Sequence, residues 1–330
     1  YPYLVEEVTI YNPENNIRLA GTLTLPGNSR QNPPVVILIS GSGPQDRDET
    51  FMGHKPFLVL SDYLTRQGIA VLRYDERGVG KSTGNFENAT TEDFSQDVLS
   101  VIKFLKNRTD IDSGKIGLIG HSEGAIIAPK VANNSEDLAF IIMLAGTGVS
   151  GKEVSLQQAL DYRNFPVENE KQYAAYVKEA IDIAASGKDS TSVKNELTRF
   201  YQNSEVLASI LPTDIDKDEF IENLVKTRTN PWTRYFYNYN PAEEIREINI
   251  PALALYGSND TQVPPKYHLQ PVKEALMASN SKNYEVILMD GLNHLFQESK
   301  TGNISEYTQI EETINPKVIE KISNWILHLI

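Results

Sequence analysis

The sequence predicts an α/β protein with a mostly parallel twisted sheet, an antiparallel N-terminal hairpin, helices on both faces and a helical insertion. Three observations indicate this class. Short apolar runs alternate with longer segments of helical periodicity, which is typical of buried parallel strands joined by helices. One strand leads through a glycine-rich turn into a helix, within Lys115 to Lys130. The stretch from Ser150 to Asn240 has helical periodicity and no convincing buried strand.

The N-terminal segment predicts a hairpin. Leu4 to Ile10 and Ile17 to Leu25 alternate apolar and polar residues around the polar turn Asn12-Pro13-Glu14-Asn15. A period of two places one face of each strand against the core and the other toward water. We therefore expect an antiparallel hairpin at one edge of the sheet.

The remaining core elements follow as alternating strands and helices, which implies right-handed crossovers between parallel strands. Buried strands are expected at Val35 to Ser40, Ile69 to Tyr74, Ile116 to Ile119, Leu138 to Ala145, Pro251 to Tyr256 and Tyr284 to Met289. Amphipathic helices are expected at Pro56 to Gln67, Glu92 to Lys106, Pro265 to Ala278 and Pro316 to Leu329. The core is thus assigned to residues 1–149 and 241–330.

Residues 150–240 predict a helical insertion into this core. Its expected helices are Val154 to Arg163, Glu168 to Ala185, Ser192 to Gln202 and Asp216 to Lys226. The insertion ends in the dense aromatic stretch from Asn230 to Pro241. These aromatic residues either fasten the insertion to the core or line a pocket for an acyl or leaving group.

Composition excludes several functional classes. The formal charge of −13 argues against a nucleic-acid partner, which needs clustered Lys and Arg. No apolar run approaches the ~18 residues of a membrane-spanning helix. The chain has no cysteine, so disulfides, thiolate nucleophiles and zinc–thiolate sites are excluded. Because the chain begins at Tyr1 rather than methionine, we expect a removed leader, which favours an exported protein, periplasmic or extracellular, over a cytoplasmic one.

The motif Gly120-His121-Ser122-Glu123-Gly124 marks the candidate nucleophile. A serine at the tip of a sharp strand-to-helix turn has a strained backbone, and the flanking glycines let the neighbouring strand and helix approach closely. The turn lifts the hydroxyl clear of the sheet. It also directs the first amides of the helix toward an oxyanion formed beside Ser122.

A serine hydroxyl needs a base within hydrogen-bond reach and an acid that orients the base. Among five histidines, His294 lies on a loop directly after a late strand, which predicts the base. His121 is expected to be structural, because in an extended backbone its side chain points away from that of Ser122. The other three lie in a polar loop or in predicted helices: His54, His268 and His328.

The orienting acid is expected to be Asp260, in Gly257-Ser258-Asn259-Asp260, a loop at the carboxyl end of a buried strand. Asp290 competes, but its neighbour Gly291 indicates a turn. The chain order Ser122, Asp260, His294 matches the order of nucleophile, acid and base in one of the folds that use a catalytic triad of these three residue types. The second oxyanion donor should come from the loop after Val35 to Ser40, so the amides of Ser42 and Glu123 are expected to form the hole.

Two loops resemble nucleotide-binding motifs and are rejected. In Gly41 to Asp46 the sixth position is not glycine, and Pro44 removes an amide. Gly80-Lys81-Ser82 lacks the first glycine of a P-loop and no helix follows. The histidines are scattered and no H-E-x-x-H is present, so neither a metal nor a cofactor is expected.

Four segments resemble the α/β-hydrolase superfamily: Gly41 to Asp48, Tyr74 to Ser82, Gly120 to Gly124 and Gly257 to Pro264. The first and third are most similar to the EstD-type bacterial carboxylesterases. The resemblance covers nearly the whole chain and implies a serine esterase for small acyl esters, with residues 150–240 as a helical cap. One departure is Ser40-Gly41, where many lipases and esterases carry His-Gly.

One glutamate and two arginines near these motifs are charged residues whose roles can be predicted. Glu123 adds a carboxylate beside the nucleophile and should disfavour anionic substrates. Arg47 and Arg77 are expected to form structural ion pairs with flanking acids rather than to bind a substrate carboxylate.

The sequence thus predicts a serine carboxylesterase that cleaves small to medium acyl esters through an acyl-enzyme. A capped serine aminopeptidase or an acyl thioesterase on the same core remains the alternative, and a non-catalytic binding protein is disfavoured because nucleophile, acid and base are all present. The expected partner is a small-molecule ester. The oligomeric state is left open.

Overall fold

The computed structural model describes residues 1–27, 32–163, 165–167 and 169–330. The chain divides into two compact units. The core unit comprises Tyr1–Phe86, Glu92–Gly148 and Pro241–Ile330, and the helical unit comprises Glu87–Thr91 and Val149–Asn240.

The core unit is built on one eight-stranded sheet of order β1-β2-β4-β3-β5-β6-β7-β8. The β1–β2 and β2–β4 pairs are antiparallel and all others are parallel. The strands are β1 (Tyr3–Asn12), β2 (Ile17–Pro26), β3 (Val35–Ile39), β4 (Ala70–Tyr74), β5 (Ile116–His121), β6 (Leu138–Leu144), β7 (Ala252–Gly257) and β8 (Tyr284–Met289). The predicted mostly parallel sheet with an N-terminal antiparallel hairpin is confirmed.

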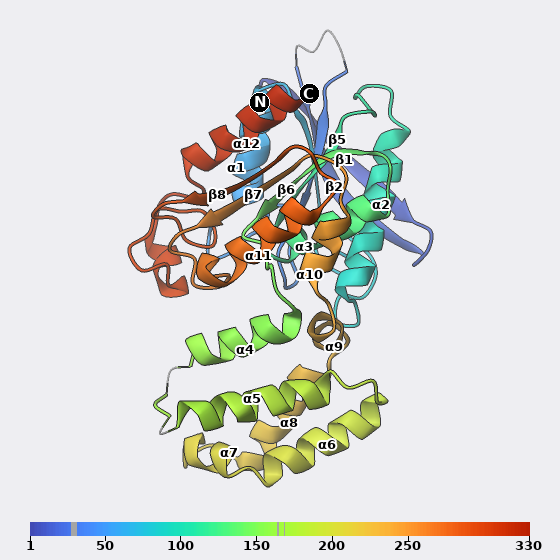
Figure 1. The fold of residues 1–330 in the computed structure, drawn as a ribbon. Helices are drawn as coiled ribbons and strands as arrows, with labels where there is room; N and C mark the ends of the chain where they lie inside the picture. Colours follow the sequence, from blue (N-terminus) through green and yellow to red (C-terminus); the bar gives the residue numbers. More distant parts are fainter. Residues whose placement is uncertain (28–31, 164, 168) are drawn as a thin grey trace. The chain divides into compact units, whose positions relative to one another are not determined.

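Helices cover both faces of the sheet (Figure 1). On one face α1 (Pro56–Arg66) and α12 (Pro316–Leu329) pack against each other and bury a shared apolar cluster with β3 and β6. The other face carries α2 (Thr91–Lys106), α3 (Glu123–Asn133), α10 (Pro241–Glu247) and α11 (Pro265–Ala278). The central strands β3 to β7 are apolar on both sides because helices exclude water from both.

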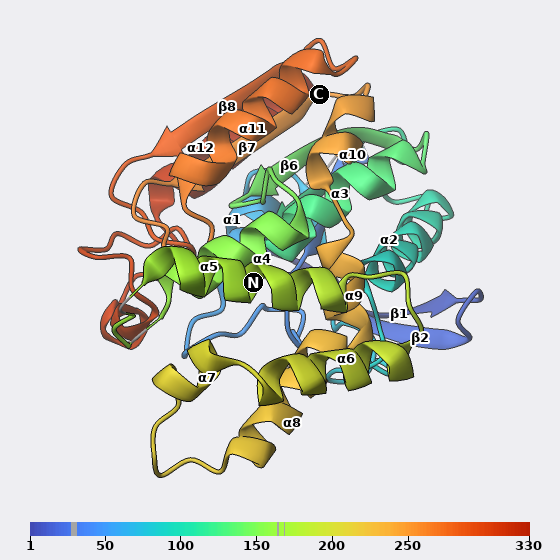
Figure 2. The ribbon, with the colours of Figure 1, turned by 60° about the horizontal axis from the view of Figure 1, so that its bottom comes forward.

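The helical unit has its own apolar core, and its helices are labelled in Figure 2. Its helices are α4 (Gly151–Asp161), α5 (Glu170–Ala184), α6 (Ser190–Gln202), α7 (Glu205–Ile210), α8 (Lys217–Thr229) and α9 (Pro231–Tyr237). Fully buried side chains such as Val193 and Leu197 face that core from α6. The helix expected from Glu168 begins at Glu170 among the described residues, and Glu168 itself lies outside them.

Short helices were missing from the sequence prediction. These are α7, α9, α10 and the 3₁₀ helix η1 (Ile304–Gln309), each of six or seven residues. Two turns of helix are too short for a periodic pattern to be recognised, and their ends are instead marked by caps. The Asn230 side chain, for example, accepts a hydrogen bond from the Thr233 amide and starts α9.

A buried ion pair ties the hairpin turn to α2. The Arg77 guanidinium donates from Nε and Nη2 to the two carboxylate oxygens of Asp97, at 2.7 and 2.9 Å. It also reaches Asp93 and the Asn15 side chain. Asn12 donates to the same Asp97 carboxylate at 2.7 Å. One carboxylate therefore links three segments that are distant in sequence.

We expect the replacement Asp97→Asn to lower the free energy of unfolding by about 3 kcal/mol, because it leaves the Arg77 charge buried with only the more exposed Asp93 as counterion. Urea denaturation measures the effect. The control Arg66→Ala removes the exposed Arg66–Asp62 pair and should shift the midpoint far less. Equal shifts in both variants would contradict a dominant role for the buried pair.

Candidate active site

Ser122 lies at the tip of a strained turn between β5 and α3. Its φ of 53° and ψ of −110° fall in a region that non-glycine residues rarely adopt. A Cβ on Gly120 would lie 2.0 Å from the Gly124 carbonyl oxygen, and a Cβ on Gly124 would lie 2.0 Å from the Ile39 carbonyl oxygen. Only glycine fits at either position, so the motif is required by close packing of β3, β5 and α3.

His294 and Asp260 form a buried pair on neighbouring loops. The His294 Nδ1 lies 2.7 Å from Asp260 Oδ2, and the Asp260 side chain is wholly buried. The other oxygen, Oδ1, accepts the amides of Gln262 and Val263 at 2.8 and 2.9 Å. Both carboxylate oxygens are thus occupied, which fixes the orientation of the imidazole that Asp260 holds.

The environment keeps Asp260 ionised. Burial by itself raises the pKa of this carboxyl, but the His294 imidazole and the amides of Val263 and Gln262 outweigh burial and lower the pKa below its ordinary value of 3.8. A carboxylate accepts the Nδ1–H of His294. The lone pair of His294 is then on Nε2, the nitrogen that a general base must present.

The loop that carries His294 is locked in place. Asn293 and Gln297 exchange hydrogen bonds, Asn293 Nδ2 to Gln297 Oε1 and the Gln297 amide to Asn293 Oδ1, both at 2.9 Å. The His294 carbonyl oxygen lies 2.9 Å from Nε2 of His121, the residue before Ser122. The rings of His121 and His294 have centroids 4.8 Å apart. These contacts hold the His294 loop against the turn that carries Ser122.

The loop after β3 passes beside Ser122. A Cβ on Gly41 would lie 3.1 Å from the Cβ of Ser122. The Gly41 amide donates to Glu49 Oε1 at 2.8 Å, so the next amide along the loop is that of Ser42, whose residue is exposed. Glu123 directly follows Ser122 and begins α3. Ser42 and Glu123 therefore lie on the two segments that adjoin Ser122.

The competing residues have other partners. His54 is buried and its Nε2 lies 2.8 Å from the Tyr307 carbonyl, while His268 is buried in α11. His328 lies at the end of α12, where its Nδ1 is 2.6 Å from the Asn324 carbonyl. Asp290 is exposed and accepts the Ser258 hydroxyl at 3.2 Å. Of the two candidate acids, the structure pairs Asp260 with His294.

The two arginines form ion pairs within the core unit, as predicted. Arg47 donates from Nε and Nη2 to both oxygens of Asp75. Arg77, however, pairs with Asp97 and Asp93 rather than with the flanking acids expected from the sequence, because α2 brings them to its guanidinium.

Two buried glutamates on the loops near Ser122 were not predicted from the sequence. Glu49 Oε1 accepts the Gly41 amide and lies 2.8 Å from His121 Nδ1, and Glu76 accepts the Ser40 hydroxyl and the Gln45 amide at 2.9 and 3.0 Å. Burial and the carboxylates of Glu123 and Glu49 raise the pKa of Glu76 well above its ordinary value, against the hydrogen bonds from Gln45 and Ser40. No sequence motif marks a glutamate in an irregular loop as buried, and Glu49 itself has a positive φ of 53°.

Among the described residues, no group of three or more His, Cys, Asp or Glu is arranged to hold a metal ion. No helix in that part of the chain is long and apolar enough to cross a membrane.

The lowered pKa of Asp260 gives a pH dependence of stability. Its contribution to the free energy of unfolding is complete above pH 3.8, the ordinary pKa of the carboxyl. The contribution is lost as the pH falls through the lower pKa of the folded state. We expect urea midpoints measured from about pH 5 to about pH 2 to fall more steeply in the native chain than in Asp260→Asn. The control Asp290→Asn, which alters an exposed carboxylate, should follow the native chain. Parallel curves for the native chain and Asp260→Asn would contradict the prediction.

Sequence relatives carry hydrolase and acyl-transfer names. The esterase EstD of Thermotoga maritima is 26% identical over 312 residues, which are 94% of this chain and 65% of EstD. The chain thus spans just under two thirds of the length of that relative. An acyl transferase of Photorhabdus laumondii subsp. laumondii is 27% identical over 233 residues, 66% of this chain and 70% of that protein.

Solved structures share the fold. The Pyrococcus furiosus esterase Pf2001 has a TM-score of 0.61 at 17% identity, covering 99% of this chain and 91% of that one. The α/β hydrolase GrgF from Penicillium sp. sh18 has a TM-score of 0.60 at 15% identity, covering 99% and 97%. Est1E from Butyrivibrio proteoclasticus, solved with ferulic acid, has a TM-score of 0.56 at 17% identity, covering 98% of each chain. The predicted α/β-hydrolase fold is confirmed.

A family model places the chain more narrowly. The model described as X-Pro dipeptidyl-peptidase (S15 family) matches residues 15–280, a range that includes Ser122 and Asp260. The resemblance to the α/β-hydrolase superfamily that the motifs indicated is confirmed by this match and by EstD. The chain belongs to the X-Pro dipeptidyl-peptidase (S15) family, one of the α/β-hydrolase families.

Proposed function

We propose that the chain is a serine carboxylesterase that cleaves small to medium acyl esters. The observation that carries the proposal is the buried pair of His294 Nδ1 and Asp260 Oδ2 at 2.7 Å. The carbonyl oxygen of His294 contacts His121, which directly precedes Ser122 in its strained turn. A nucleophile, a base and an orienting acid are the groups that acyl transfer requires. The esterase EstD, 26% identical over 94% of this chain, supports an ester as the substrate.

In the proposed first step, Nε2 of His294 takes the proton of the Ser122 hydroxyl as its oxygen attacks the ester carbonyl. Asp260 holds the tautomer with the proton on Nδ1 and stabilises the imidazolium that forms. His294 then gives the proton to the leaving alcohol and an acyl-enzyme remains. In the second step His294 removes a proton from water, whose oxygen attacks the acyl carbonyl. His294 then returns this proton to the Ser122 oxygen as the bond between that oxygen and the acyl carbon breaks, which releases the acid.

The tetrahedral oxyanion of each step is assigned to the amides of Ser42 and Glu123. Ser42 belongs to the loop that passes beside Ser122, and Glu123 begins α3, where the helix dipole favours negative charge. Hydrogen-bond donors that are already in position stabilise an oxyanion without reorganisation during the reaction.

We propose that the helical unit is the cap domain of this hydrolase and selects the substrate. It forms its own apolar core. In its aromatic stretch Trp232 and Phe236 stack with centroids 5.0 Å apart, whereas Tyr237 packs in that core and its hydroxyl accepts from Arg228.

Cleavage of peptides after proline is the second candidate function. It is favoured by the family match, whose description is X-Pro dipeptidyl-peptidase. The same triad serves both reactions, since each forms an acyl-enzyme and differs only in the leaving group.

We expect Ser122→Ala to lower kcat for short p-nitrophenyl esters by at least about 10⁴-fold, because the nucleophile is lost. Asp260→Asn should lower kcat by about 10⁴-fold through the wrong imidazole tautomer. Steady-state kinetics measure both, and Asp290→Asn serves as the control that should keep native activity. Substantial hydrolysis by Ser122→Ala would reject Ser122 as the nucleophile.

The two candidate functions are separated by a parallel assay of short and long p-nitrophenyl esters, amino-acid p-nitroanilides and Gly-Pro p-nitroanilide. An esterase should prefer the esters by a large factor in kcat/KM. Cleavage of anilides but not esters would favour the peptidase and overturn the esterase proposal.

Glu123 is expected to disfavour anionic substrates. Its carboxylate is buried beside the nucleophile and close enough to Glu76 to raise the pKa of that group, so repulsion there is poorly screened. We expect Glu123→Gln to raise kcat/KM for a carboxylated ester relative to its neutral analogue by about tenfold. The matched control Glu298→Gln, on the His294 loop, should leave the ratio unchanged. An unchanged ratio in Glu123→Gln rejects the idea.

A further inference from the structure

We infer that Glu49 and His121 form a charged positioning pair that holds the loop after β3 and the His294 loop against the nucleophile turn. The inference rests on the proposed function, since it assigns these residues to the same site. Neither residue touches the reacting atoms in the proposed mechanism. Their role would be to fix the amide loop and the base relative to Ser122.

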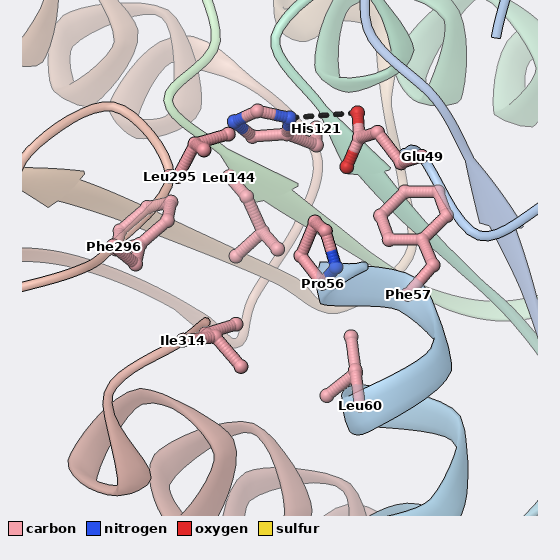
Figure 3. A pocket seen from close by; sticks show the side chains of 9 residues that line it. All are labelled: Glu49, Pro56, Phe57, Leu60, His121, Leu144, Leu295, Phe296 and Ile314. Carbon is pink, nitrogen blue, oxygen red and sulfur yellow. Dashed lines mark hydrogen bonds and ion pairs between the residues drawn. The ribbon is translucent and has the colours of Figure 1, made fainter. Parts of the chain in front are cut away.

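The pair joins three segments that are distant in sequence, and Figure 3 shows its Glu49–His121 contact. A single oxygen of Glu49, Oε1, accepts the Gly41 amide at 2.8 Å and faces His121 Nδ1 at 2.8 Å. The other ring nitrogen of His121, Nε2, lies 2.9 Å from the His294 carbonyl oxygen. Because His121 directly precedes Ser122, the loop after β3, the nucleophile turn and the His294 loop are connected through one imidazole.

These partners require a proton on Nε2 of His121 and allow two arrangements at Nδ1, of which we infer the charged one. A backbone carbonyl only accepts, so Nε2 carries a proton. Oε1 of Glu49 already accepts the Gly41 amide, and an ionised carboxylate accepts a second hydrogen bond from Nδ1–H. Both ring nitrogens then donate, which makes His121 an imidazolium paired with the Glu49 carboxylate. The alternative is a neutral imidazole that accepts a proton held by Glu49, which keeps the contacts without the charges.

The surroundings favour a fixed pair. Glu49 and His121 are 3% and 6% exposed. The small cavity beside them, about 10 Å³, is otherwise lined by apolar side chains: Pro56, Phe57, Leu60, Leu144, Leu295, Phe296 and Ile314 (Figure 3). This lining offers the pair no other hydrogen-bond partner on that side. The left-handed φ of 53° at Glu49 is a strained conformation that the neighbouring structure must maintain.

The arrangement also explains which backbone amide of the loop after β3 can donate a hydrogen bond to an oxyanion. The Gly41 amide is used by Glu49, which orients the peptide chain where a Cβ built on Gly41 would lie 3.1 Å from the Ser122 Cβ. The following amide, that of Ser42, is thereby presented on the next peptide unit. Loss of the Glu49 charge would loosen both this loop and the His294 carbonyl contact.

The charges around His121 give the pair a pH dependence. Burial lowers the pKa of His121, but the charge and hydrogen bond of Glu49, the His294 carbonyl and the charge of Asp260 outweigh burial, so the pKa is raised above 6.5. The facing groups are Glu49, Asp260 and His294, and Glu76 is close enough to both Glu49 and Glu123 for their charges to act on it. Because the pKa of His121 is raised, the stabilisation that the charged pair gives to the folded state is complete below pH 6.5. It is lost as the pH rises through the folded-state pKa.

The variant Glu49→Gln tests the charge separately from the contacts, because the glutamine Oε1 can accept the same two hydrogen bonds. We expect kcat for a p-nitrophenyl ester to fall by about 10- to 100-fold with little change in KM, and the alkaline decline of kcat to move to lower pH. The matched control is His54→Gln, which alters another buried histidine bonded to a backbone carbonyl and should leave the pH profile unchanged. An unchanged kcat and pH profile in Glu49→Gln overturns the inference.

A readout independent of activity comes from ¹⁵N-histidine NMR of the native chain at about pH 7, with the His121 signals assigned by their loss in His121→Gln. Protonation of both ring nitrogens supports the charged pair, and a neutral imidazole overturns it. Labelling of Ser122 by a fluorophosphonate is measured in parallel. Absence of labelling would reject the proposed function, whereas the NMR result would still decide the state of His121.

Discussion

The strained backbone of Ser122 is the constraint on which the rest of the site depends. A left-handed conformation at a non-glycine residue costs on the order of 1–3 kcal/mol. Here it is held because the Ser122 amide donates to the Leu144 carbonyl at 2.8 Å and its carbonyl accepts from Ala125 at 3.1 Å. Without side chains on Gly120 and Gly124, α3 packs closely enough on β3 and β5 for these bonds to form. The sheet therefore maintains a geometry that an isolated turn would not keep.

Strand order explains why residues far apart in sequence meet. The strands β3, β5, β7 and β8 are parallel, so the loops that follow them leave the same edge of the sheet. β3 is the direct neighbour of β5, which brings Gly41 beside Ser122. β7 and β8 are neighbours, which brings Asp260 and His294 together. The contact between His121 Nε2 and the His294 carbonyl oxygen then connects these two halves of the edge.

Much of the fold and part of the candidate site could be predicted from the sequence. Apolar runs reveal the buried strands, and the residues directly after each strand are then known to lie at the sheet edge. Asp260 and His294, which the structure pairs, were proposed from such positions. Glu49 was not, since its partner His121 is 72 residues away and nothing in a loop sequence signals a buried carboxylate. The partners of Arg77 were likewise missed, because only the packing of α2 places Asp97 against the guanidinium. Periodicity gives elements, whereas side-chain partners depend on how the elements pack.

The burial of the Asp260–His294 pair has a consequence for how dissolved ions act on this protein. Mobile ions screen charges that are in contact with water over a Debye length of about 8–10 Å, but they screen enclosed pairs much less. Asp260 and His294 are 3% and 5% exposed, whereas most of the acidic residues behind the formal charge of −13 are on the surface. Ionic strength should therefore act on the approach of charged molecules from solution and hardly at all on the attraction within the pair.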